Sequence, residues 1–551
     1  RILILLRLLP NKLSRIYKTQ LYSRRTFLKL SAALTAILAG GFFFKGSKDQ
    51  KVKHILSSAS HEKLAVTLSL SQATSEMGLL LDDDYMVKGI STDSEGKHWQ
   101  FIVNNLSPNK SYKLQLVSEN VNIYKAWSLK TFPEPHSEID SLKVMSFTCP
   151  GGGDGFRASG REFFKPFKFR QNIFEEGLSK NPDIVISIGD HVYWDLRGQD
   201  SPPVGRNSKL IKFFLGGYLR LRYGAFNRNE TVNSIVNEKV LKRIGNEQIA
   251  SLYGTKFKSV PIFFIPDDHD YFENDDAEEE IVTFPADKFS KYAFRKMADL
   301  FYPPLLDTPD GEPGRHTGRI RYGNIFEGLM ADCAGNMTLG NDKALLISNE
   351  DENWLMSRIK KSRAKHLAFI PSHPLGYTAG KWREWYPDVV AEDGATGVVV
   401  NELLSGLQGS LTTNVNKYLW QEGWFLQHQR LLSSVAERKG SRFIFSGDIH
   451  AIGASSIIKS GQMNLKKRVK TFLVGPVSSS TGTWPSFARG ITASSPEHLE
   501  SYQLYPTKEE NGFTLFHLDN EKAFAEIISC GGHDPENGDS GRMKSRERIL
   551  I

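Results

Sequence analysis

Short stretches in which apolar and polar residues alternate occupy the first part of the chain beyond its N-terminal leader. Residues 99–103 and 112–116 are examples, and polar turns separate such stretches up to residue 132. Alternation with a period of two predicts half-buried antiparallel strands. Residues 64–135 therefore predict a small all-β sandwich, which a stiff Pro-containing segment at 131–135 closes. Strands that belong to the larger domain are the alternative.

From residue 142 onward compact apolar runs alternate with helical stretches, such as 169–180 and 352–362. This alternation predicts an α/β domain over residues 140–530. Each of four apolar runs ends in a polar side chain that could bind a metal ion. The four runs are 143–149, 184–190, 262–268 and 443–448.

Three further segments are polar. Residues 46–63 read as a linker, and residues 531–551 as a C-terminal tail that frays. Residues 196–260 form a long, basic, glycine-containing insertion. The insertion is either a lid over the functional site or a peripheral helical excursion, and its pattern leaves both open.

The leader, residues 1–45, has the design of an export signal. Arg24 and Arg25 precede an apolar, small-residue stretch at 30–44, which is typical of a twin-arginine signal. The stretch is shorter than the ~20 residues that a membrane span needs. The expected partner is the twin-arginine export machinery, and the expected location is the periplasm or cell surface. An uncleaved leader that anchors the protein to the membrane, or a basic start without function, is the alternative.

Charge and cysteine content exclude several classes of protein. Residues 1–53 hold twelve Lys and Arg against one acid, so the formal charge of +8 leaves the rest of the chain slightly acidic. The basic total therefore implies no nucleic-acid-binding module. Three cysteines in 551 residues exclude a disulfide scaffold, and the length suggests two or three domains.

Six side chains at or just beyond the ends of the apolar runs could enclose two cations. Ligand sites in open α/β sheets lie beyond the carboxyl ends of the strands, so residues distant in sequence can meet there. A carboxylate can bridge two cations, and a cation lowers the pKa of a thiol or a phenol enough to bind it. The six are Cys149, Asp190, Tyr193, Asp268, Asp448 and His450.

Two of these side chains also have an ordinary structural explanation. A lone buried cysteine such as Cys149 is commonly part of the core, and so is an aromatic residue such as Tyr193. Asp270 and the acids at 275–280 read as a solvated loop. His373 and His191 are candidates for a second-metal or substrate contact, although His191 could instead support the ligands from behind.

In their order and spacing these residues resemble the calcineurin-type metallophosphoesterase superfamily, and within it the alkaline phosphatase D (PhoD-like) family. The resemblance rests on Ser146-Phe-Thr-Cys149, the Gly-Asp-x-x-Tyr motif at 189–193, Asp-Asp-His-Asp at 267–270 and Ser-Gly-Asp-x-His at 446–450. The turn at 106–112 resembles one in fibronectin type III domains. The departures are His191, Trp194, Asp332-Cys333-Ala334 and the length of the insertion.

The resemblance implies a four-layer αββα fold behind a fibronectin-III-like or immunoglobulin-like module. It implies Fe3+ held by four residues and Ca2+ that shares one of them with two further acids. It also implies a hydrolase of phosphoric esters, in which a metal-activated hydroxide attacks phosphorus and His269, beside Asp268, acts as the general acid. The implied Fe3+ ligands are Cys149, Asp190, Tyr193 and His450, and the implied Ca2+ ligands are Asp190, Asp268 and Asp448.

Three alternatives stay open at this point. One is a phosphodiesterase or phospholipase built on the same metal core. Another is a purple-acid-phosphatase-like enzyme, which would have Asn-His-Glu and Gly-His-x-His where this chain has residues 268–270 and 447–450. The third is a non-catalytic surface-binding protein whose sandwich grips a glycan or peptide.

Overall fold

The computed structural model describes residues 52–158, 161–194, 217–271, 277–278, 281–282, 286–311, 316–338, 341–378, 389–391, 397–399, 422–479, 483, 493–496, 499–530 and 542–551. The predicted export leader lies outside the described residues, as do parts of the linker, the insertion and the tail. Within the described part of the chain, no helix has both the length and the apolar character to cross a membrane.

The N-terminal module consists of two antiparallel sheets whose buried side chains, such as Val66, Phe101, Leu79 and Leu116, belong to one core. In sheet order the first contains β1 (Val52–Ala59), β2 (Leu64–Leu70), β6 (His98–Val103) and β5 (Ile90–Ser91). The second contains β4 (Tyr85–Lys88), β3 (Gly78–Leu81), β7 (Ser111–Ser118) and β8 (Val121–Asn122), with β9 (Trp127–Lys130) also paired to β7. The likeness to fibronectin type III domains stays a prediction.

The linker prediction for residues 46–63 was wrong over most of the described part, because strand β1 lies there. Its polar side chains are buried and find partners on the larger domain. Ser57 Oγ donates to the Lys258 carbonyl at 3.1 Å, and Ser58 Oγ donates to the Pro304 carbonyl at 2.8 Å. Because these contacts satisfy the hydroxyl groups, a strand with a polar sequence can be buried.

Two mixed sheets form the larger domain. In the first, the neighbours β14, β13 and β10 are parallel, whereas the later strands are antiparallel. Its order is β14 (Ile262–Ile265), β13 (Ile184–Ile188), β10 (Ser141–Thr148), β26 (Asn511–Asp519), β27 (Ala523–Cys530) and β28 (Lys544–Leu550). The second has the order β17 (Gly318–Tyr322), β18 (Phe326–Ala331), β19 (His366–Pro371), β22 (Ser441–Ser446), β24 (Met463–Val474), β23 (Ile452–Ser460) and β25 (Leu499–Lys508).

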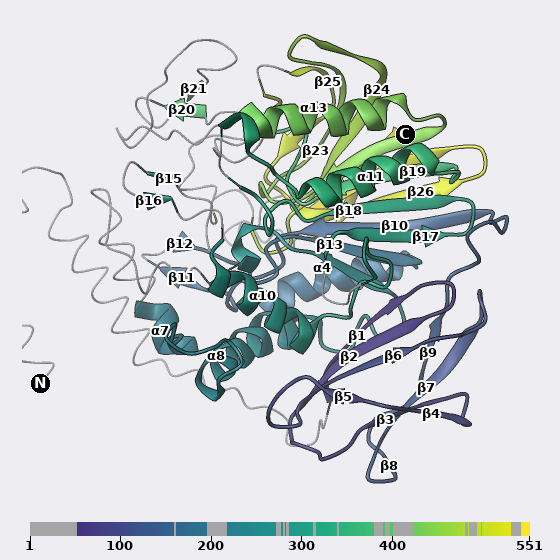
Figure 1. Cartoon of the computed structure of the whole chain (residues 1–551), viewed down its shortest axis with the longest axis vertical. Coiled ribbons are helices and arrows are strands. Elements are labelled where there is room, and N and C mark those ends of the chain that lie inside the picture. The colour runs from purple at the N-terminus through teal and green to yellow at the C-terminus, as the bar shows by residue number, and fades with distance from the viewer. Residues whose placement is uncertain are drawn as a thin grey trace, which may run out of the picture.

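The two sheets pack face to face through aromatic side chains. Phe516 of β26 contacts Phe443, Phe445 and Phe472 of the second sheet, with ring centroids 5.2, 4.6 and 5.5 Å apart. Helices α11 (Asn349–Lys361) and α13 (Glu422–Glu437) cover the second sheet, as Figure 1 shows. Helix α4 (Phe167–Ser179) packs on the first sheet, where its Phe174 ring meets Phe147 at 5.0 Å. The α/β prediction is therefore confirmed.

The predicted frayed tail was also partly wrong, because β28 extends the first sheet along β27. The strand is polar because it lies at the edge of the sheet, and its side chains bond across the pair. Ser545 Oγ donates to Glu526 at 2.6 Å, and Arg548 lies 3.3 Å from the same carboxylate.

The described part of the insertion is helical. It contains α7 (Gly217–Tyr223), α8 (Ile235–Gly245), a π-helical turn η2 (Asn246–Ala250) and α9 (Ser251–Tyr253). Helix α8 begins at Ser234, whose side chain accepts from the Asn237 amide, and packs against α10 (Lys288–Phe301). Short elements are β11 (Arg157–Ala158), β12 (Arg161–Glu162), β15 (Ala277–Glu278), β16 (Ile281–Val282), β20 (Val389–Ala391), β21 (Gly397–Val399), η3 (Asp268–Tyr271) and η4 (Asn341–Lys343).

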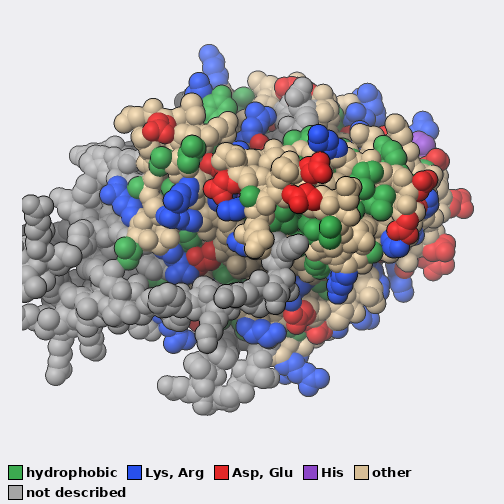
Figure 2. Space-filling view, turned by 90° about the horizontal axis from the view of Figure 1, so that it is seen from below, with side chains coloured by type: hydrophobic (Ala, Val, Ile, Leu, Met, Phe, Trp, Pro, Cys, Tyr) green, Lys and Arg blue, Asp and Glu red, His purple; other side chains and the backbone are tan. Residues whose placement is uncertain are grey.

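A network of buried charges joins the N-terminal module to the insertion. Lys242 Nζ of α8 lies 3.0 Å from Asp93 Oδ2 and 3.1 Å from Glu238 Oε1. Glu238 also accepts from the Ser94 amide and hydroxyl and lies 3.2 Å from Lys296. On the outer surface at the N-terminal module, acidic, basic and apolar side chains are intermixed (Figure 2).

Candidate metal centre

The carboxyl ends of strands from both sheets meet at one place. Thr148, the last residue of β10, forms a bridge with Pro476 of the second half of the domain. Its hydroxyl lies 3.0 Å from the Asp448 amide, which follows β22. This contact brings Cys149 beside the loop of Asp448 and His450, with Cys149 Sγ 3.2 Å from the Asp448 carbonyl.

Four of the six predicted ligands have a left-handed backbone conformation. Their φ values are 49° at Cys149, 56° at Asp190, 68° at Asp448 and 55° at His450. Such a conformation costs about 1–3 kcal/mol for a residue other than glycine and concentrates at functional sites. Its occurrence at four residues beyond three converging strand ends indicates that side-chain placement has been favoured there over backbone stability.

Cys149, Asp190 and His450 form one compact group, with their ligand atoms all within 4.8 Å of one another. The Tyr193 hydroxyl joins this group, since it lies 2.8 Å from Asp190 Oδ2 and 3.3 Å from His450 Nε2. All four side chains are buried. The structure therefore brings together the thiol, carboxylate, phenol and imidazole that the sequence singled out, close enough to contact one ion.

Asp190 also belongs to a second group, with Asp268 and His269. The His269 ring packs against Tyr193, with ring centroids 4.4 Å apart. Both Asp268 and His269 lie in the 3-10 turn η3 and are almost fully buried. His269 is thus placed to transfer a proton or to serve as a ligand.

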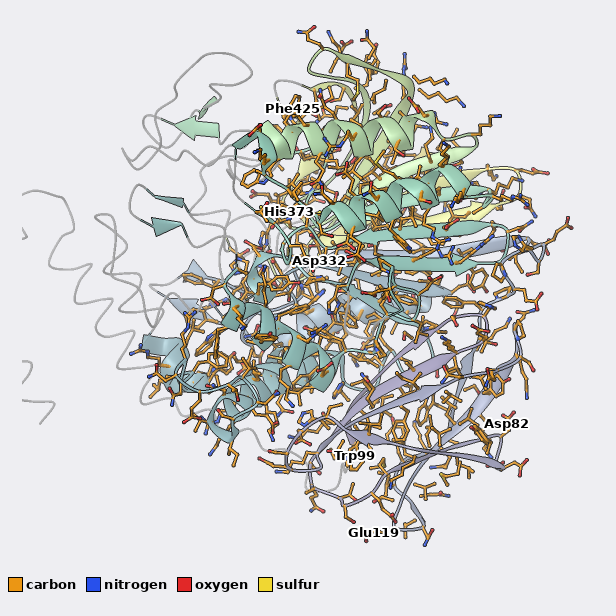
Figure 3. The ribbon with its side chains drawn as sticks, viewed as in Figure 1. Asp82, Trp99, Glu119, Asp332, His373 and Phe425 are labelled. Atoms are coloured by element: carbon orange, nitrogen blue, oxygen red, sulfur yellow. The ribbon has the colours of Figure 1, made fainter. Side chains whose placement is uncertain are left out.

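A third group contains Asp267, His373 and Asp448. His373 Nδ1 lies 2.7 Å from Asp267 Oδ1, and the placement of His373 beyond the end of β19 can be followed in Figure 3. Asp267 was not among the predicted ligands. Its signal was the doubled acid at 267–268, because a tight turn points successive side chains toward different partners. In this group Asp448 lies with Asp267 and His373, whereas the family resemblance placed it with Asp190 and Asp268.

His191 does not face these groups. Its Nδ1 lies 3.2 Å from Ser187 Oγ and its Nε2 lies 3.1 Å from the Ile265 carbonyl. Burial lowers the pKa of His191 to about 3, so the ring stays neutral. The geometry therefore supports the structural interpretation of His191, and not a contact with substrate or metal.

The sequence context predicted that Asp270 belongs to a solvated loop, and this prediction was wrong. The side chain is buried, and it accepts from the His191 amide at 2.8 Å and the Asp267 amide at 2.9 Å. Burial, followed by the charge of Asp190, raises the pKa of Asp270 well above its usual value. Asp270 holds together the two loops that carry Asp190 and Asp267.

The electrostatics of the centre fit bound cations. Burial, and then the nearby charge of Asp190, raises the pKa of Cys149 and of Tyr193 well above their usual values. Asp190 Oδ1 is buried and has no hydrogen-bond partner among the described residues. A buried carboxylate oxygen without a partner is costly, and a cation would relieve that cost while deprotonating the thiol and the phenol.

Gln248, in the π-helical turn, supports the centre from behind. Its Oε1 accepts from the Gly152 amide at 2.8 Å and the Tyr193 amide at 2.7 Å, and its Nε2 donates to the Tyr193 carbonyl at 3.1 Å. A π-helical turn inside a helix often marks a functional site. Nothing in the sequence pattern indicated Gln248, because a glutamine in a helix is usually exposed.

Arg170 of α4 holds the loop that follows Cys149. Its guanidinium is fully buried and donates to the carbonyls of Pro150, Gly151, Gly152 and Gly153 at 2.7–2.9 Å. All four acceptors are backbone carbonyls, so the loop wraps around the guanidinium group of Arg170. Arg170 thereby fixes the path of the chain from Cys149 to the Gly152 amide that Gln248 accepts from.

No protein-family model and no curated protein matches the chain. Solved structures do. The structure of PhoD is 14% identical and covers 92% of this chain and 91% of its own, with a TM-score of 0.58. A purple acid phosphatase from yellow lupin (Lupinus luteus) is 13% identical and covers 90% of this chain and 73% of its own, with a TM-score of 0.50. The chain therefore has the metallophosphoesterase fold that PhoD and purple acid phosphatase share.

Proposed function

We propose that this chain is an exported, metal-dependent phosphoesterase. One observation carries the proposal: Cys149, Asp190, Tyr193 and His450 come from the ends of three strands and meet in one buried group. The shared fold with PhoD and purple acid phosphatase supports the same reaction class.

The donor atoms suggest how two cations would be divided. Thiolate, phenolate and imidazole suit iron, so Cys149, Tyr193 and His450 would hold Fe3+ with Asp190. The oxygen-rich side, with Asp268 and Asp448, would suit Ca2+. His373 lies with Asp267 and Asp448. Its imidazole would favour a transition metal over Ca2+ at that position, so the metal analysis decides between the two.

When bound, the cations would supply Lewis acidity, which offsets the negative charge that develops on the phosphoryl oxygens and activates water as the nucleophile. In hydrolysis a water oxygen bonds to phosphorus, the P–O ester bond breaks and the leaving alkoxide takes up a proton. We assign the donation of that proton to His269, which lies beside Asp190 and Asp268. Gln248 and Asp270 hold the backbone of Tyr193 and His191 in place.

The test is a measurement of metal content on the purified full chain, alongside rates for a phosphomonoester, a phosphodiester and a phospholipid. The proposal expects close to two metal ions per chain and hydrolysis of at least one substrate. Preference for the diester or the phospholipid would identify the alternative activity on the same core. A chain that binds metal and hydrolyses none of them would contradict the proposed function.

Export through the twin-arginine machinery belongs to the proposal as well. It rests on Arg24 and Arg25 before an apolar stretch. An Arg24→Lys/Arg25→Lys variant should remain inside the cell, whereas the unaltered chain should be found in the periplasm or at the cell surface. Equal export of both would contradict this part of the proposal.

A further inference from the structure

A cavity of about 620 Å³ opens at the opposite end of the second sheet from the metal centre. Ser441 and Arg442, at the start of β22, line this cavity, whereas Asp448 follows the other end of that strand. Asp448 lies six positions after Arg442, which corresponds to about 20 Å of extended chain. The cavity is therefore distinct from the metal centre.

Three basic side chains line the cavity: Arg442, Arg468 and Lys470. Lys470 Nζ donates to the Leu550 carbonyl at 2.5 Å, and the Arg442 guanidinium donates to the carbonyls of Gly440 and Arg468. No acidic residue is in the lining, and none of the three basic groups has an ion pair with the described residues. The cavity lining thus gathers three basic side chains and no acidic side chain.

The neighbouring groups add unused donors and an aromatic wall. Arg442 Nε and Ser441 Oγ are buried atoms without a hydrogen-bond partner among the described residues. The Arg468 guanidinium lies 5.1 Å from the centre of the Tyr502 ring, which orients it. Burial lowers the pKa of Lys470 and of Arg442, which shows that their charged forms are partly desolvated. A bound anion stabilises partly desolvated cations.

We propose that this cavity is a second anion-binding site, which takes a phosphate group. Two guanidinium groups and an ammonium group provide the donor geometry that phosphate oxygens accept best. The volume lies in the range of small-ligand sites, so the phosphate could be free or part of a larger molecule. This phosphate site in the cavity is proposed independently of whether the chain hydrolyses phosphoric esters.

Isothermal titration of the full chain with inorganic phosphate tests the proposal. In an Arg442→Gln/Arg468→Gln variant, one class of phosphate sites should weaken at least tenfold. The matched control is Lys466→Gln/Lys467→Gln, which removes the same charge from β24, the strand that carries Arg468, at positions outside the cavity lining. This control should leave binding within about twofold. An unchanged isotherm in the first variant, or an equal loss in the control, would overturn the proposal.

Two further measurements keep the test decisive. Arg468 is exposed, so Arg468→Gln alone should fold normally and still weaken binding. An Asp190→Ala variant, which is expected to lose the metals, should retain the site, so failure of the proposed function and failure of this site are distinguishable. Titration with glycerol phosphate and with a linear polyphosphate separates the sources: tighter binding than free phosphate indicates a phosphate carried on a larger molecule.

Discussion

Two buried clusters of charge in this protein are built on opposite principles. In the network between the N-terminal module and α8, Lys242 lies between Asp93 and Glu238. Burial opposes ionisation of Asp93, but hydrogen bonds from His98 and Lys242 outweigh it and hold the pKa of Asp93 below its usual value. In that network each of these charged side chains lies beside one of opposite charge.

The metal centre differs in its thiol, its phenol and one carboxylate oxygen. Burial and the charge of Asp190 raise the pKa of Cys149 and Tyr193. Burial opposes ionisation of Asp190, but His269 and His450 outweigh it and lower its pKa, while the buried atom Asp190 Oδ1 has no hydrogen-bond partner among the described residues. The comparison teaches that burial of charge does not by itself distinguish a structural cluster from a functional one. A cluster in which a buried carboxylate oxygen has no hydrogen-bond partner, and in which the backbone is strained, is organised to bind a ligand.

The largest expected effect comes from removing the residue that two groups share. Asp190→Ala should abolish metal retention and reduce hydrolysis to background, because both the Cys149 group and the Asp268 group lose a carboxylate. The metal-free protein should also lose stability, because the buried Tyr193 hydroxyl, which donates to Asp190 Oδ2 at 2.8 Å, loses that acceptor. Metal analysis and thermal unfolding of metal-free samples would check this, and full metal content in the variant would contradict it.

His269→Ala should lower turnover by about two to four orders of magnitude, the usual contribution of a general acid. Metal content should stay at the value of the unaltered chain, because the proton donor is not needed to hold the ions. The loss should be small for esters with good leaving groups, which depart without a proton. Loss of a metal ion would instead identify His269 as a ligand.

Lys242→Met breaks the other cluster and should have the converse effect. Removing one partner of a buried ion pair costs about 3–5 kcal/mol, because it leaves charges uncompensated. Unfolding in denaturant would measure the loss. Metal content and turnover of the folded variant should match those of the unaltered chain, and a loss of metal would show that the two clusters are not independent.

Gln248→Leu should have the smallest effect of the four. Residues that orient metal ligands typically contribute about 10- to 100-fold in metal affinity. Gln248→Glu retains the oxygen that accepts from Gly152 and Tyr193 but loses the amide that donates to the Tyr193 carbonyl, so it should restore only part of that affinity. Competition with a chelator would measure both variants. Equal losses in the two would indicate a packing role for Gln248 rather than a positioning role.

The strand ends could be predicted because each combines a continuous apolar run with an abrupt polar residue. This pattern identified Cys149, Asp190 and Asp448, and the structure shows them at converging ends of β10, β13 and β22. Strand β1 was missed since its serines are buried through hydrogen bonds to a distant part of the chain. No local pattern records such a contact.

The residues that hold the metal ligands in place could not be predicted from the sequence, for a related reason. Gln248 supports the metal ligands because the π-helical turn places it against Tyr193, which lies 55 residues earlier in the chain. Asp267 and Asp268 could not be assigned to separate groups without the geometry of the turn. The sequence thus indicates which chemistry is available, whereas the tertiary structure decides which side chain faces which ion.

X-ray absorption at the iron edge of the purified protein tests the central claim most directly. A common ion held by Cys149 and His450 predicts a sulfur scatterer at about 2.3 Å, typical of a thiolate ligand, together with nitrogen and oxygen scatterers. The sulfur signal should vanish in Cys149→Ser. Iron without a sulfur neighbour, or the same sulfur signal in Cys149→Ser, would contradict the account.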